Sequence, residues 1–170
     1  LSSSEFGVYS VILTTIQFYT LISTSWIKDS ILRFYQSFNN ESKTSDLIST
    51  SFITISVVDL LVILFVIIIN CVYNFFEFID IIFIVLLILS KTYNLLFITL
   101  YRARQKIIKV NFFQLIENFS KFFVGLPIIY LGFLGKVKSI IMGMVIAEVF
   151  LVSLGIYGLS KNYSITFKRF

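Results

Sequence analysis

The chain has 170 residues, of which 58% are apolar and 14% are charged, and its mean hydropathy is +0.95. Soluble domains are typically about 45–50% apolar and about 25% charged, so this composition excludes a soluble globular domain and a disordered chain. It indicates an integral membrane protein. Because the chain has no His and one cysteine, Cys71, we expect no zinc site, no His general base, no catalytic Cys–His pair and no cofactor.

Five apolar stretches are each long enough to cross a membrane, since a bilayer core about 30 Å thick needs about 20 mostly apolar helical residues. Residues 60–69 read LLVILFVIII, without the alternation that a membrane β-barrel strand requires. The predicted fold is therefore an all-α integral membrane protein, a single bundle of five transmembrane helices. The predicted spans are residues 7–27, 49–69, 78–100, 110–132 and 137–159.

The first span is uncharged but rich in Ser and Thr, which makes its hydrophobicity modest. Apolar residues continue beyond it at helical spacing as far as Phe38. We expect either that the first helix continues to this point or that an interfacial helix follows it. Residues 39–42, which read NNES, then predict a turn.

Ionisable side chains lie inside three other spans. Asp59 is in the second, Lys91 is in the third, three residues before Asn94, and Glu148 is in the fifth. An ionisable residue at mid-bilayer costs roughly 2.5–3.5 kcal/mol, so such residues usually pair within the bundle or serve function. Lys91 is either a partner for Asp59 or Glu148 or, with Asn94, a contact for an anionic substrate. Asp59 and Glu148 are either neutral or paired packing groups, or coupling-ion residues.

The fourth span carries polar residues at helical spacing along one face, with apolar residues on the other. Glu117 precedes Lys121 by four residues, the favourable orientation for an ion pair on a helix. This face is predicted to be either a polar seam between helices or the wall of a hydrated translocation cavity. Its members are Asn111, Gln114, Glu117, Asn118 and Lys121.

The fifth span has a row of small residues, Ser139, Gly143, Ala147 and, after Leu151, Gly155. Small residues at four-residue spacing allow two helices to approach closely. We expect this row to be a packing seam.

The basic residues collect at one set of span ends. Ten of the 14 Lys and Arg residues flank that side, whereas Lys136 and Lys138 flank the other. Because short cytoplasmic loops are enriched in Lys and Arg, Leu1 is predicted to lie outside and Phe170 in the cytoplasm. This topology explains the basic loops, and we expect no nucleic-acid partner.

Three segments resemble a known family. They are EFGVYS at residues 5–10, SWIKDSILRFY at residues 25–35 after the Ser/Thr-rich span, and LYRARQK at residues 100–106. Together they are similar to the polysaccharide flippases of bacterial O-antigen and capsule clusters, in the multidrug/oligosaccharidyl-lipid/polysaccharide exporter superfamily. The resemblance implies that the five spans correspond to the second through sixth of a 12–14-span transporter. The chain would then be a fragment holding most of one six-helix bundle, which agrees with its start at Leu1 rather than Met.

The resemblance also implies an activity. A family member is a transporter, not an enzyme, and moves an undecaprenyl-pyrophosphate-linked oligosaccharide from the inner to the outer leaflet of the bacterial inner membrane. Its further partners would be membrane lipids and the polysaccharide polymerase machinery. Arg33 matches the family's Arg, and we expect it to receive the pyrophosphate together with Lys28. The candidate substrate-binding residues are Arg33, Lys28, Lys91, Asn94, Gln114, Glu117, Asn118 and Lys121, and the candidates for a coupling-ion or structural role are Asp59 and Glu148.

Other functions stay open at this point. A drug or small-cation antiporter of the same superfamily would need acidic groups facing the cavity, and Asp59 and Glu148 keep that possibility. A non-catalytic membrane scaffold subunit would need no binding site. A membrane polymerase or ligase would carry large outer loops with Arg or His, whereas the predicted outer loops are short and the chain has no His.

Overall fold

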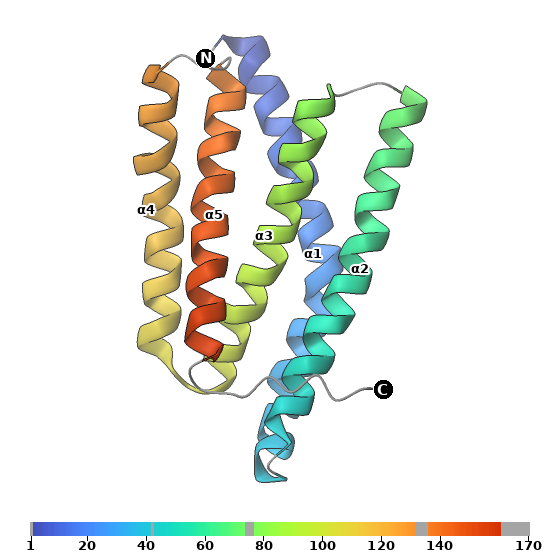
Figure 1. The fold of residues 1–170 in the computed structure, drawn as a ribbon, viewed down its shortest axis with the longest axis vertical. Helices are drawn as coiled ribbons and strands as arrows, with labels where there is room; N and C mark the ends of the chain where they lie inside the picture. The colour runs from blue at the N-terminus through green and yellow to red at the C-terminus, as the bar shows by residue number, and fades with distance from the viewer. Residues whose placement is uncertain (1, 42, 74–76, 132–135, 161–170) are drawn as a thin grey trace.

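The computed structural model describes residues 2–41, 43–73, 77–131 and 136–160. Every regular element in these residues is a helix, and consecutive helices run in opposite directions (Figure 1), which confirms the all-α prediction. The helix bounds lie within about five residues of the predicted spans, apart from the C-terminal extension of α1. The helices are α1 Ser3–Asn40, α2 Thr44–Tyr73, α3 Phe78–Ala103, α4 Ile107–Leu131 and α5 Lys136–Ser160.

Four helices of the described chain, α1, α2, α3 and α5, are long and apolar enough to cross a membrane. The protein is therefore a helical membrane protein. The fourth predicted span falls on α4, which is not among these four and in which several side chains lie outside the described set. Helix α4 packs against α5 and α3 as part of the same bundle.

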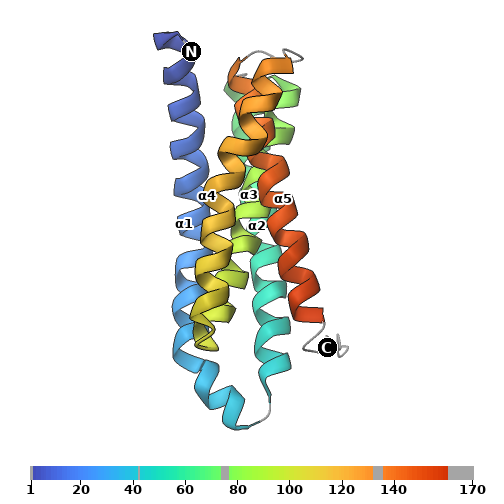
Figure 2. The same ribbon diagram turned by 90° about the vertical axis from the view of Figure 1, so that its left-hand side faces the viewer.

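Helix α1 is much longer than a single membrane crossing. It begins with a capping box, in which the Ser2 hydroxyl accepts from the Glu5 amide at 3.3 Å and the Glu5 carboxylate accepts from the Ser2 amide at 2.7 Å. Its 38 residues correspond to about 57 Å at 1.5 Å per residue. The helix passes Phe38 without a break and ends at Asn40, so the expected turn starts about two residues later than predicted. With the start of α2 it forms a hairpin that extends beyond α3, α4 and α5 (Figures 1 and 2).

Helix α3 lies at the centre of the bundle and packs against all four other helices. From Leu96 to Tyr101 every one of its side chains is buried. Apolar side chains of α1 and α2, such as Ile31 and Ile55, complete the core on one side, and Leu151 of α5 does so on another. Helix α3 is therefore the common packing partner of the other four helices.

The small residues of α5 form the predicted packing seam. Ser139, Gly143, Ala147 and Gly155 are all buried. A Cβ atom at Gly155 would collide with the ring of Phe97 on α3. The absence of a side chain at Gly155 thus lets the two helices approach closely.

The ends of α3 and α5 are also joined at the end of the bundle away from the basic loops. Lys138 of α5 donates to Glu77 Oε2 at 2.5 Å and lies 3.4 Å from Asp80 Oδ1. The hydrogen bond from Lys138 lowers the pKa of the Glu77 carboxyl. These ion pairs join the start of α5 to the start of α3, although pairs near the surface add little stability.

We predict that Gly155→Ala destabilises the protein by about 1–3 kcal/mol, because overpacking a filled core costs that much. Phe97 is fully buried and has no room to move aside. Gly7→Ala is the matched control, since nothing lies within 4 Å of a Cβ atom at that position. There the higher helix propensity of Ala should stabilise the protein slightly. Thermal unfolding of both variants in detergent would check this, and equal melting temperatures would contradict it.

Candidate functional site

A groove runs between α1 and α4, with α3 as its floor. Most of its lining residues are polar, but most of the surface that they present to the groove is apolar. Within the described residues α1 and α4 make no backbone contact, and each of them packs against α3 and α5. The groove has a volume of about 420 Å³, within the range of about 300–1,000 Å³ that small-molecule sites have. We call it the central groove. Its lining residues are Gln17, Thr20, Leu21, Thr24, Ser25 and Lys28 from α1, Lys91, Asn94, Leu95 and Ile98 from α3, and Glu117 from α4.

The α1 wall of the central groove is one face of a helix. Gln17, Thr20, Thr24 and Lys28 recur at spacings of three and four residues, which places them in one row. The hydroxyl of Thr20 donates to the Ile16 carbonyl at 2.8 Å, and that of Thr24 donates to the Thr20 carbonyl at 2.7 Å. Their donor capacity is therefore used within the helix, and the hydroxyl oxygens remain acceptors. Of this row, the sequence singled out Lys28, whereas Thr20 and Thr24 counted only toward the modest hydrophobicity of the span.

Four of the residues predicted from sequence meet in the central groove. Lys28 comes from α1, Lys91 and Asn94 come from α3, and Glu117 comes from α4. Lys91 lies near the middle of α3, so the groove is at mid-depth of the bundle. Two ammonium groups and one carboxylate give the lining a formal positive charge.

Asn94 connects the central groove to a buried carboxylate beneath it. Its amide nitrogen donates to Glu148 Oε2 on α5 at 3.1 Å, and both residues are almost fully buried. This contact orients the Asn94 amide at the floor of the groove. Glu148 does not line the groove itself.

Asp59 lies on another side of α3. Its Oδ2 accepts a hydrogen bond from the Thr92 hydroxyl at 2.6 Å, which joins α2 to α3, and both residues are buried. Its Oδ1 has no hydrogen-bond partner among the described residues. Asp59 and Glu148 therefore both make hydrogen bonds between helices, as one of the two sequence interpretations expected.

The remaining predicted residues lie outside the central groove. Arg33 is exposed, and its guanidinium carbon lies 5.6 Å from the centre of the Phe34 ring. It follows Lys28 by five residues, so the two side chains point about 140° apart around α1. Gln114 and Asn118 are exposed on α4. The side chain of Lys121 lies outside the described residues, and so does its predicted pairing with Glu117.

The predicted polar face of α4 is thus divided in the structure. Glu117 points toward α1 and lines the groove, whereas Asn111, Gln114 and Asn118 lie on the exposed surface of the helix. Neighbouring helical positions differ by about 100°, so Glu117 and Asn118 cannot face the same way. The polar stripe of α4 therefore crosses the edge of the groove, with Glu117 inside it and Asn118 outside it.

Comparison with known proteins adds no assignment: no protein-family model, curated protein or solved structure matches the chain. The central groove and its hydrogen-bonded support are therefore the basis for a functional proposal.

We predict that Thr92→Val destabilises the protein by about 1–3 kcal/mol, because it removes the one described donor to the buried Asp59 carboxyl. Thr92→Ser should keep the hydrogen bond and most of the stability. The double variant Thr92→Val with Asp59→Leu should be more stable than Thr92→Val alone, because no buried polar group is then left without a partner.

Thr54→Val is the matched control, since the Thr54 hydroxyl bonds only to the Thr50 carbonyl of its own helix, at 2.8 Å. Melting temperatures in detergent would compare the four variants. If Thr92→Val and Thr54→Val lower the melting temperature equally, the hydrogen bond between α2 and α3 contributes nothing to stability.

Proposed function

We propose that the protein is a flippase that moves a lipid-linked oligosaccharide across the membrane, with the central groove as part of the path. The observation that carries this proposal is the convergence of Lys28 and Lys91, from two different helices, on one groove at mid-depth of the bundle. Ionisable residues inside a membrane are costly, and those that face a cavity in the bundle are candidates for a substrate pathway.

The chemistry of the lining matches the parts of such a substrate. A pyrophosphate is anionic and accepts hydrogen bonds, so ammonium groups suit it. Sugars need polar partners, which the amide of Gln17 and the hydroxyl of Ser25 supply. Because the described backbones of α1 and α4 make no contact, an isoprenoid tail can stay in the surrounding lipid while the head group crosses.

The specific substrate follows from the resemblance described above. It is an undecaprenyl-pyrophosphate-linked oligosaccharide of O-antigen or capsule synthesis, carried across the bacterial inner membrane. In that setting the chain forms part of one bundle, and the groove opens to alternate sides as bundles rock against one another. The polymerase machinery that uses the flipped sugar is then a partner.

The arrangement of the acids favours this proposal over a drug or cation antiporter. Such a transporter would place acidic groups in its cavity, whereas Asp59 and Glu148 accept hydrogen bonds at helix interfaces away from the central groove. The one carboxylate in the lining, Glu117, accompanies two lysines.

We predict that Lys91→Gln lowers the rate of lipid-linked oligosaccharide transfer about tenfold, because hydrogen bonds to charged groups contribute about 1.5–3 kcal/mol. Lys28→Gln should act in the same direction. Lys109→Gln, which removes an exposed cation outside the groove, should leave the rate unchanged. Transfer would be measured in membrane vesicles, with protein abundance measured in parallel.

The same vesicles allow a second readout. If Lys91→Gln leaves sugar-lipid transfer intact, or if the wild-type vesicles expel a cationic dye instead, the flippase proposal is wrong. If Lys91→Gln lowers protein abundance as well as transfer, Lys91→Arg separates the two effects. It keeps the charge and should restore transfer partly.

We propose that the basic end of the bundle faces the cytoplasm, following the distribution of Lys and Arg. Cysteines introduced at Lys43 and at Glu77, in a Cys71→Ser background, should react with a membrane-impermeant thiol reagent from opposite sides. In intact cells the cysteine at position 77 should react and the one at position 43 should not. The two changes are matched, since each removes one exposed ion pair. Labelling of both positions from one side would contradict the topology.

A further inference from the structure

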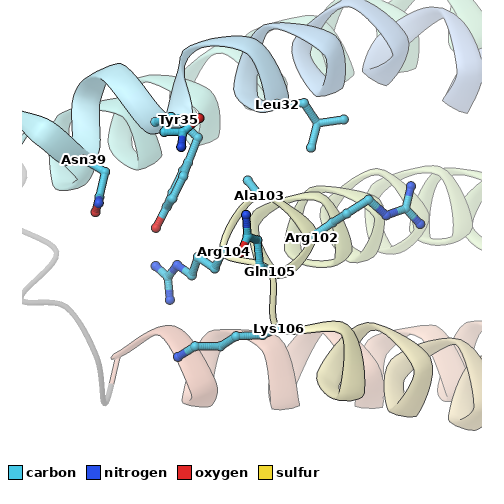
Figure 3. Close-up of a pocket in the computed structure, with 9 residues that line it drawn as sticks. Leu32, Tyr35, Asn39, Arg102, Ala103, Arg104, Gln105 and Lys106 are labelled. Atoms are coloured by element: carbon cyan, nitrogen blue, oxygen red, sulfur yellow. The ribbon is translucent and has the colours of Figure 1, made fainter.

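A second hollow lies at the basic end of the bundle, separate from the central groove. It sits where the chain turns from α3 into α4, beside the last turns of α1 (Figure 3), and has a volume of about 630 Å³. We call it the basic pocket. Its polar lining consists chiefly of Tyr35, Gln36 and Asn39 from α1 and Arg102, Arg104 and Lys106 from the turn.

The backbone of the turn presents these cations around one hollow. The Arg104 amide donates to the Leu100 carbonyl at 3.1 Å as α3 ends, and the Val110 amide donates to the Lys106 carbonyl at 3.2 Å as α4 begins. Between them Gln105 has φ 57°, a left-handed conformation that non-glycine residues adopt rarely. The chain therefore reverses direction within three residues, and Arg104 and Lys106 stay close together.

The side chains of the pocket form a set of hydrogen-bond donors. Arg104 and Lys106 extend in the same direction, toward the part of α1 that carries Tyr35 and Asn39, whereas Arg102 extends the other way (Figure 3). Guanidinium and ammonium groups only donate, and phenol and amide groups can donate. A ligand that matches this lining must carry several acceptor oxygens.

The charge of the pocket points to the same ligand. No carboxylate is among the lining residues that the structure describes. Glu41, which follows the end of α1, pairs with Lys43 at 2.9 Å and is not a lining residue. A cluster of guanidinium and ammonium groups without an acid is typical of a site for phosphate.

The depth of the pocket indicates where such a phosphate would come from. The membrane-spanning segment of α3 ends at Ala103, so Arg104 and Lys106 lie just beyond it. Lipid phosphates lie at this level, and basic residues next to a span attract anionic lipids.

We propose that the basic pocket binds a phosphate group at the membrane surface, supplied either by the headgroup of an anionic phospholipid or by a soluble phosphate. This site is separate from the central groove, and the proposal does not rest on transport. A lipid held there would fix the turn between α3 and α4 against the extended end of α1. Its failure would leave the flippase proposal unchanged.

The test uses the purified protein in a neutral detergent and calorimetric titration with three probes: dihexanoyl phosphatidylglycerol, dihexanoyl phosphatidylcholine and sodium phosphate. Phosphatidylglycerol should bind saturably, and Lys106→Gln should weaken it about tenfold, as loss of a charged hydrogen bond does. Arg104→Gln should weaken it at least as much. Lys106→Arg should keep most of the binding.

Lys109→Gln is the charge-matched control. Lys109 is exposed near the start of α4 and lies over the Tyr101 ring at 5.3 Å, outside the pocket lining. Equal weakening by Lys106→Gln and Lys109→Gln would show a diffuse electrostatic effect and overturn the site. Because Lys106 is exposed, its replacement should leave the melting temperature unchanged, which separates lost binding from misfolding.

The probes then identify the source of the phosphate. If sodium phosphate binds saturably and displaces phosphatidylglycerol, the pocket recognises phosphate itself and accepts a soluble one. If it does not displace the lipid although Lys106→Gln abolishes lipid binding, the headgroup is the ligand. Equal binding of phosphatidylcholine and phosphatidylglycerol, or no saturable binding of any probe, would overturn the proposal.

Discussion

Polar side chains that a helix carries into a membrane must find partners inside the protein, because lipid offers none. Helix α3 carries three such side chains within one turn, Lys91, Thr92 and Asn94. Thr92 and Asn94 point about 160° apart around the helix, so each faces a different neighbour. Thr92 bonds to Asp59 on α2, and Asn94 bonds to Glu148 on α5. These contacts hold α2 and α5 on different sides of α3.

The same requirement explains why a groove exists beside α3. Lys91 lines the space between α1 and α4 together with polar residues of α1 and with Glu117 of α4. Filling this space with apolar side chains would remove the polar surroundings of a charged group, which is costly in a membrane. The groove and the two interhelical hydrogen bonds are therefore parts of one arrangement around α3, and a change in one of them affects the others.

Much of the fold could be predicted because apolar runs of this length leave few alternatives. The five spans matched the helices, and the row of small residues on α5 matched a buried seam. The partners of the buried carboxylates could not be predicted, since Asp59 and Thr92 are 33 residues apart in the chain and no local pattern connects them. The groove was found only in part. Lys28, Lys91, Asn94 and Glu117 were singled out as isolated polar groups, whereas Thr20 and Thr24 were missed because threonines are common in apolar helices.

The length of α1 has a mechanical consequence. Its middle forms a wall of the central groove, while its last turns lie beyond the ends of α3, α4 and α5 and are joined to α2 by a short turn. A continuous helix about 57 Å long behaves as a lever arm whose fulcrum is its packing on α3. A small tilt of α1 that widens or narrows the groove therefore produces a larger displacement at the protruding tip. A ligand that tilted α1 at the groove would therefore move the tip at the surface, and a load applied to the tip would act back on the groove.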